Sequence, residues 1–236
     1  MARFVISPYI FQTRVKERVK FAFVSDLHDC ENQPILQAIQ ENGADAILIG
    51  GDFIHSSTVY ANGIQFLKEA AKLLPTFCVL GNHELRFGGD LIPIVRDIPI
   101  TLLRDEDVEF KGVRIGGISS STAYSEDKIL LNHRYLQTYS KKDGFKLLLC
   151  HHPEYYGDHL RQYKIDLILS GHAHGGQWRL FGRGAYAPGQ GVFPKYTSGL
   201  YEERLLVGRG LGNHHIVPRI NNRRELIFIT IEPFEN

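Results

Sequence analysis

The residues most able to do chemistry stand in five short groups along the chain, and an apolar run directly precedes each group. Their side chains are carboxylates, imidazoles and one amide, and no thiolate is among them. Such oxygen and nitrogen ligands suit Mn, Fe, Zn or Co better than Ca or a thiolate-held structural zinc. These groups predict a transition-metal site, and they read Ser25-Asp26-Leu27-His28, Gly51-Asp52, Gly81-Asn82-His83-Glu84, His151-His152 and Gly171-His172-Ala173-His174.

The number of candidate ligands indicates two metal ions rather than one. They are Asp26, His28, Asp52, Asn82, His172, His174 and one of the adjacent His151 and His152. This set is too large for one tetrahedral ion, but two ions ~3.5–4 Å apart that share a carboxylate would use it, and such a pair is the clamp of phosphate hydrolysis. The cations outweigh two aspartates and a bridging hydroxide, so the site favours an anionic, small phosphorylated substrate.

The apolar runs before these groups are predicted to be buried strands. Each run is short and ends in Gly or a polar residue, which is typical of strands covered on both faces. In an open α/β sheet, side chains that follow different strands converge outside the carboxyl ends of those strands. One site is therefore expected at the ends of strands spanning Phe21 to Val24, Ala46 to Ile49, Phe77 to Leu80, Leu147 to Cys150 and Leu167 to Leu169.

The remaining elements give an α/β alternation with a β-rich C-terminal third, and no internal repeat divides the chain. We therefore predict a single domain over residues 1–236. A long ordered loop is expected between Gly175 and Gly199, where Gly, Tyr and Pro are frequent. Amphipathic spacing predicts helices at Pro34 to Gln40, Tyr60 to Leu74 and Asn132 to Ser140, and further strands are predicted at Val113 to Ile118, Leu205 to Val207 and Leu226 to Ile231.

The composition gives the molecule as a whole no electrostatic preference. The 27 Lys and Arg balance the 26 Asp and Glu, so nucleic acid is not expected as a partner, although a local basic patch would escape this test. Three single cysteines without CxxC spacing fit a reducing cytoplasm, where we expect the protein to act. No apolar run approaches the ~20 residues of a transmembrane helix. The sequence leaves the oligomeric state open.

Taken in order, the five groups closely resemble the motifs of the calcineurin-like metallophosphoesterase family. The family pattern is DxH, GDxx, GNH[D/E], H and GHxH, and the resemblance covers roughly residues 20 to 232. It implies a two-sheet β-sandwich flanked by helices, in the order αββα. It also implies a metal-dependent phosphoesterase that uses a metal-bridging hydroxide on a phosphomonoester, a phosphodiester or a pyrophosphate.

The resemblance also implies a role for each matching residue. One metal would be held by Asp26, His28, Asp52 and His174, and the other by Asp52, Asn82, His151 and His172. Asp52 would bridge the two ions, and His83 would act on the leaving group or the phosphoryl oxygens. Spacing alone does not choose between His151 and His152, and the family pattern favours His151 as the ligand.

The stretch Gly175-Gly176-Gln177 extends the last motif to GHxHGGQ. With Ala187-Pro188-Gly189-Gln190-Gly191, it is similar to a subgroup of small bacterial phosphoesterases that often carry an N-terminal membrane anchor. The sequence as given shows no such anchor, so neither anchoring nor a lipid-related substrate is carried over from the subgroup.

Several polar residues near the motifs have two readings. Glu84 is either a solvated charge or a hydrogen-bond partner that orients His83 or another ligand. His152 is expected to line the cleft or to precede the Pro153 turn, and Arg86 either contacts phosphate or is solvated. Outside the motifs, a structural or solvated role is favoured for His55, His133, His159, Arg209, His214 and His215.

Two other functions compete with a small-molecule phosphoesterase. A nuclease of the same family is disfavoured by the near-zero net charge and the lack of an obvious basic, aromatic groove. A binding scaffold on the same fold is disfavoured by the complete ligand set. Metal content and hydrolysis of a chromogenic phosphate ester separate an enzyme from a scaffold.

Overall fold

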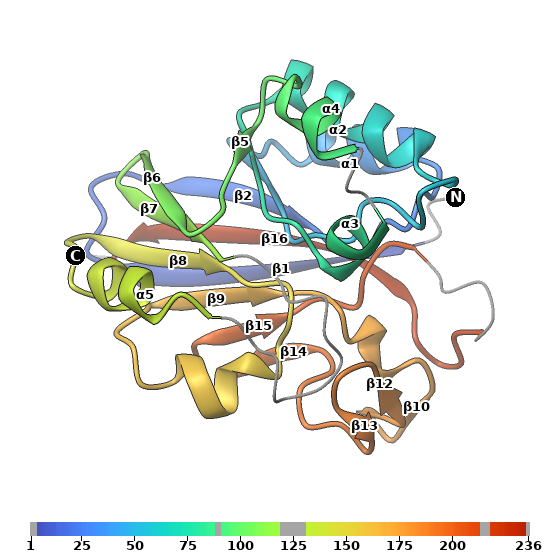
Figure 1. Cartoon of the computed structure of the whole chain (residues 1–236). Coiled ribbons are helices and arrows are strands. Elements are labelled where there is room, and N and C mark those ends of the chain that lie inside the picture. Colours follow the sequence, from blue (N-terminus) through green and yellow to red (C-terminus); the bar gives the residue numbers. More distant parts are fainter. Residues whose placement is uncertain (1–3, 88–90, 119–130, 213–217, 235–236) are drawn as a thin grey trace.

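Two six-stranded sheets form the centre of the protein, and helices cover their outer faces (Figure 1). The computed structural model describes residues 4–87, 91–118, 131–212 and 218–234. The first sheet has the order β1 (Phe4–Thr13), β16 (Arg224–Pro233), β2 (Val19–Val24), β3 (Ala46–Ile49), β4 (Thr76–Cys78) and β5 (Thr101–Leu102). The second has the order β14 (Gly199–Tyr201), β15 (Leu205–Val207), β9 (Leu167–Ser170), β8 (Phe145–Leu149), β7 (Val113–Gly117) and β6 (Glu106–Phe110).

The central strands are apolar at successive positions because both of their faces are buried. In β2, Phe21 and Phe23 point into the core between the two sheets, where Leu147 and Leu149 of β8 also lie. Ala22, between the two Phe residues, faces the opposite side and joins the core under the helices. A side-chain period of two explains this split, and it confirms the expected αββα arrangement of two sheets flanked by helices.

Different helices cover the two outer faces. α1 (Gln33–Glu41), α2 (Ala61–Leu73) and α4 (Ile92–Arg96) cover the first sheet, and α5 (His133–Ser140) and a π-helical turn (Tyr156–Leu160) cover the second. The predicted helices are confirmed as α1, α2 and α5, with ends that differ by at most one residue. No helix in the described part of the chain has the length and apolar character needed to cross a bilayer.

The structure adds elements that the sequence pattern did not predict. β1 is an edge strand parallel to β16, and its pattern is interrupted by Ser7 and Pro8. α3 (Asn82–Phe87) begins at a candidate ligand, where only a turn was expected. The predicted long loop contains two short hairpins, β10 (Arg179–Leu180) with β11 (Arg183–Gly184), and β12 (Tyr186–Ala187) with β13 (Gly191–Val192).

Candidate metal centre

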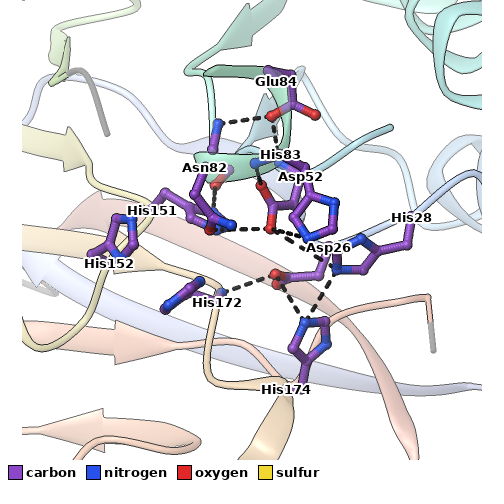
Figure 2. Close-up of polar contacts among 12 residues, drawn as sticks. Asp26, His28, Asp52, Asn82, His83, Glu84, His151, His152, His172 and His174 are labelled. Atoms are coloured by element: carbon purple, nitrogen blue, oxygen red, sulfur yellow. Dashed lines mark hydrogen bonds and ion pairs between the residues drawn. The ribbon is translucent and has the colours of Figure 1, made fainter. Parts of the chain in front are cut away.

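The candidate ligands converge where the carboxyl ends of the two sheets meet (Figure 2). All seven are buried. Three strands of the first sheet and two of the second lead into them, so the site belongs to both sheets rather than to the edge of one. Asp26 and His28 follow β2, Asp52 follows β3, Asn82 begins α3 after β4, His151 follows β8, and His172 and His174 follow β9.

The ligands form two compact groups, and each draws residues from both sheets. In the first group, Asp26, His28 and His174 place their ligand atoms within 4.8 Å of one another. The Nε2 atoms of His28 and His174 are 3.1 Å apart. In the second group, Asp52, His151 and His172 meet the same limit. Either group has the donor set and the spacing of a metal site.

Asp52 lies between the two groups. Its Oδ2 is 3.2 Å from His151 Nε2 of the second group and 3.9 Å from His28 Nε2 of the first. Its Oδ1 accepts a hydrogen bond of 2.9 Å from the backbone N–H of His83, which fixes the rotation of the carboxylate. Asn82 joins the second group, with Oδ1 at 3.2 Å from His151 Nε2.

The loops that carry the ligands have an uncommon backbone conformation. Left-handed φ values between 43° and 63° occur at Asp26, His28, Asp52, His172 and His174. Such values cost roughly 1–3 kcal/mol each outside glycine and cluster at functional sites. Backbone hydrogen bonds between the loops hold this conformation, because Asp26 N–H donates to the Gly51 carbonyl and His28 N–H to the Asp52 carbonyl, both at 3.0 Å.

Two glycines allow carboxylates to approach the backbone closely. A Cβ on Gly81 would clash with the Asp52 carboxylate, and a Cβ on Gly171 would clash with the Asp26 carboxylate. Both glycines directly precede a candidate ligand. A residue without a Cβ at this position permits the close approach. Any larger residue at either position would displace a carboxylate from its group.

Burial and mutual charge set the protonation of the site. Burial acts to raise the pKa of Asp52, but the imidazoles of His151, His83 and His28 hold it well below its usual range. Burial acts to lower the pKa of His151, yet the Asp52 carboxylate raises it to about 10. Burial lowers the pKa of His28, with His174 adding to the effect. Asp52 is therefore ionised and His28 neutral, the forms in which both bind metals, whereas the raised pKa of His151 means that a metal bound there would displace a proton from it.

Backbone carbonyls orient two of the imidazoles. The Nδ1 of His151 is 2.7 Å from the Gly50 carbonyl, and the Nδ1 of His83 is 2.6 Å from the His55 carbonyl. A carbonyl accepts but does not donate, so both Nδ1 atoms carry the proton and both Nε2 atoms face the site. For His151 this is the arrangement of a metal-binding histidine whose other nitrogen is held by the protein.

Buried polar atoms in the site fit a bound cation. Asp26 Oδ2, His28 Nδ1 and His172 Nε2 are buried and have no hydrogen-bond partner among the described residues. Leaving such atoms unpaired is costly, and a metal-binding role for their side chains accounts for their burial together. The oxygen and nitrogen donors suit a transition-metal ion.

Glu84 is buried rather than solvated, and it forms a hydrogen bond with the backbone of another candidate ligand, Asp52, which agrees with the second sequence reading. It is 2% exposed, and its carboxylate accepts from the backbone N–H groups of Asp52 (2.8 Å), Ile54 (3.0 Å) and Gly81 (2.8 Å). Burial raises the pKa of Glu84 to about 7, and the nearby Asp52 carboxylate adds to the rise. Glu84 thus joins the loops after β3 and β4, both of which carry candidate ligands.

The substitution Glu84→Gln should lower the free energy of unfolding by about 1–3 kcal/mol, because the amide would turn a donor toward a buried backbone N–H and leave it unpaired. Turnover should also fall, since the Asp52 loop is released. Thermal unfolding and hydrolysis of a chromogenic ester measure the two effects. Glu41→Gln is the matched control, because Glu41 is exposed and accepts only from the side chain of Gln37 in the described structure. Unchanged stability in Glu84→Gln would contradict this role.

His152 and a residue that the sequence analysis did not single out lie behind the second group. His152 Nδ1 is 2.9 Å from Glu154 Oε1, and the His152 ring centroid is 4.1 Å from that of His172. The same Glu154 oxygen is 3.9 Å from His172 Nε2. At this distance Glu154 forms no hydrogen bond with His172, so it orients His152 directly and places a negative charge near His172. In the sequence, only its position directly after His151-His152-Pro153 could have indicated that Glu154 lies near the site.

Three arginines near the site have different surroundings. Arg86 is exposed, and its guanidinium lies 4.9 Å from the centroid of the Phe87 ring. Arg209 forms an ion pair of 3.0 Å with Glu225. A third arginine, Arg219, has Nη2 at 3.4 Å from His174 Nδ1, and burial lowers its pKa to about 10. No local motif signals Arg219, because only the tertiary fold brings it to His174.

The other histidines divide between site and surroundings. His55 belongs to the site, contrary to the structural role expected for it, since its ligand atoms lie within 4.8 Å of those of His28 and His83. His133 has the expected structural role, with Nδ1 at 2.7 Å from the Tyr163 hydroxyl. His214 and His215 lie outside the described residues.

Comparison with known proteins identifies the family. An uncharacterized metallophosphoesterase of Helicobacter pylori is 26% identical, over 95% of this chain but only 62% of that protein. The Escherichia coli phosphodiesterase YaeI is 27% identical, over 90% of this chain and 82% of its own length. The solved structure of the calcineurin-like phosphoesterase YfkN from Bacillus subtilis shares the fold, with a TM-score of 0.50, 12% identity and 82% coverage of each chain. A family model described as calcineurin-like phosphoesterase matches residues 19–176, so the chain belongs to this family.

Proposed function

We propose that the chain hydrolyses a small phosphate ester or anhydride with two bound transition-metal ions, drawn from Mn, Fe, Zn and Co. The ligands would be Asp26, His28, Asp52 and His174 for one ion, and Asp52, Asn82, His151 and His172 for the other. Two such ions would supply a hydroxide nucleophile near neutral pH and neutralise charge on the phosphoryl oxygens.

The position of Asp52 between two buried groups carries this proposal. A carboxylate within 4 Å of imidazoles from both groups is placed to bridge two ions. Its Oδ1 is held by the His83 backbone, so the carboxylate is oriented before a substrate arrives. Such preorganisation lowers the cost of reaching the transition state.

His83 is proposed to act on the substrate rather than on a metal. The His55 carbonyl holds its Nδ1–H, so proton exchange with a substrate falls to Nε2. That atom lies 3.9 Å from Asp52 Oδ2, and the His83 side chain is 13% exposed whereas that of Asp52 is 2% exposed. His83 can thus reach a bound ester from the open side and protonate the departing oxygen.

Phosphodiesters are the first substrates to test, because a relative similar over 90% of this chain is named as a phosphodiesterase. A water-soluble chromogenic diester isolates the chemical step from recognition of the natural substrate. Monoesters, nucleotide pyrophosphates and linear DNA complete the panel. If kcat/KM within this panel is highest for DNA, the chain acts as a nuclease rather than on a small substrate.

The protein purified without chelators should contain two transition-metal ions per chain and hydrolyse at least one ester of the panel. Chelation should remove both metals and activity, and Mn, Fe, Zn or Co should restore them, because each candidate ligand group is preformed. Elemental analysis and turnover measure the result. A protein that binds none of these metals and remains inactive would favour the scaffold.

A further inference from the structure

Two small hairpins extend from the ligand-bearing loop after β9 (Figure 1). The first joins β10 to β11 and the second joins β12 to β13. They begin five residues after His174, at Arg179, and lie outside the two main sheets. The pattern of side chains on them is unlike that of the rest of the surface.

Large apolar side chains are exposed on and beside these hairpins. Leu180 is 64% exposed, Phe181 106%, Val192 69% and Phe193 85%. Trp178 is 47% exposed and forms a β-bridge with Ile220, which is itself 47% exposed. Single exposed apolar residues are ordinary, but a gathered set of them marks an interaction surface. These six residues are called the hairpin surface below.

Two of the aromatic residues also have a costly backbone conformation. Phe181 has a φ of 49° and Phe193 a φ of 54°. Among the described residues with left-handed φ, they are the only two with aromatic hydrocarbon side chains. A bulky residue in this region costs about 1–2 kcal/mol relative to glycine. Phe181 and Gly182 are the two turn residues between the paired Leu180 and Arg183, and a two-residue hairpin turn of this kind requires positive φ at both positions. The turn therefore accounts for the conformation of Phe181, but neither aromatic side chain is buried within the chain.

The charged side chains of the segment that carries the hairpins are of one sign, although the Glu154 carboxylate lies against Gly189 of the second hairpin. Between Asp166 and Glu202 the ionised side chains are Arg179, Arg183 and Lys195, and all three are cationic. Arg183 and Lys195 are exposed, whereas Arg179 is half-buried and donates to the Gly175 carbonyl at 2.9 Å. Exposed aromatic residues flanked by cations match the chemistry of an anionic lipid surface, since the rings enter the interface and the cations meet the headgroups.

We propose that the hairpin surface docks on anionic lipid bilayers. The hairpins are tied to the candidate metal centre, because Ala185 N–H lies 3.1 Å from the Gly176 carbonyl, and a Cβ on Gly176 would clash with Gly184. Gly176 ends the short helical turn that begins at His174. Docking would therefore hold the metal centre at a fixed position relative to the bilayer, within reach of a phosphoester at its surface.

Co-sedimentation with lipid vesicles tests this proposal without using turnover. The full chain should sediment with phosphatidylcholine vesicles that contain phosphatidylglycerol, and much less with phosphatidylcholine alone. Raising the salt concentration should weaken binding, because the cationic contribution is screened. The double substitution Phe181→Ser and Phe193→Ser should reduce the partition coefficient by roughly tenfold or more, given the apolar transfer energy of two Phe side chains.

The matched control is the double substitution Ile10→Ser and Phe234→Ser. These residues are 64% and 58% exposed and lie outside the hairpin surface, so vesicle binding should not change. Thermal unfolding midpoints equal to that of the parent show that both doubles are folded. The double substitution Arg183→Gln and Lys195→Gln tests the cationic contribution to vesicle binding and should weaken it. Its matched control is the double substitution Lys16→Gln and Lys141→Gln, which should leave binding unchanged.

Two results would overturn the proposal. One is absence of binding to anionic vesicles, or equal binding by the parent and the Phe181 and Phe193 double variant. The other is a dimer in solution that this double variant splits into monomers, because the hairpin surface would then pair with a second copy of the chain. Since neither result depends on hydrolysis, both are independent of the proposed function.

Discussion

Asp52→Asn should remove both metals and lower turnover by about 10³-fold or more, whereas Asp26→Asn should deplete one metal and retain more activity. An amide is a weaker ligand than a carboxylate, and Asp52 lies within 4 Å of imidazoles from both groups. Asp26 belongs only to the first group. Metal ions contribute several kcal/mol to phosphoryl transfer, and each ~1.4 kcal/mol is tenfold in rate.

Elemental analysis of the two variants, purified in parallel, provides the comparison. Both replacements remove one charge and keep the shape of the side chain, so they differ mainly in the position of the ligand between the groups. Their folding is compared by thermal unfolding in chelator, where metal content no longer contributes. If Asp52→Asn keeps two ions and near-parental turnover, Asp52 does not bridge them.

His83→Asn should retain both metals, lose rate modestly on nitrophenyl esters, and lose about 10²–10⁴-fold on alkyl esters. A nitrophenolate departs readily without a proton, whereas an alkoxide requires one. The geometry supports this difference, because Nδ1–H is held by the His55 carbonyl and Nε2 faces the site. Rates across diesters of graded leaving-group pKa, measured with metal content on the same samples, give the result.

The control for His83→Asn is His133→Asn. The Nδ1 of His133, like that of His83, is close to an oxygen, here the Tyr163 hydroxyl at 2.7 Å, but His133 is exposed and lies outside both ligand groups. It should change neither metal content nor the dependence on leaving group. Equal losses for His83→Asn across the whole ester series would refute the general-acid role, and loss of metal would show that His83 supports the ligands instead.

The sequence predicted the ligands well because their signal is local. Asp26 and His28, or His172 and His174, stand two residues apart at the end of an apolar strand. Strands buried on both faces are recognisable as short apolar runs, so the elements that deliver the ligands were also predictable. The ranges of β3 and β15 agree with the prediction residue for residue.

The sequence singled out Glu84 beside the ligands but could not predict its contacts, because these depend on distant backbone. Glu84 accepts from three N–H groups in the loops after β3 and β4, and no spacing within a motif encodes that contact. The His55 side chain reaches the site from a loop whose course follows from tertiary structure. β1 was missed for a similar reason, since its partner β16 begins more than 200 residues later and Pro8 interrupts its pattern.

The order of strands in the first sheet has a consequence for biosynthesis. β16, the last strand of the chain, lies between β1 and β2, which are made first. A nascent chain emerges from its N-terminus, so this sheet stays incomplete until β16 has left the ribosome. Each ligand group also includes a residue that follows β9: His174 in the first group and His172 in the second. The two proposed ligand groups are therefore completed late, only after His172 and His174 have been made.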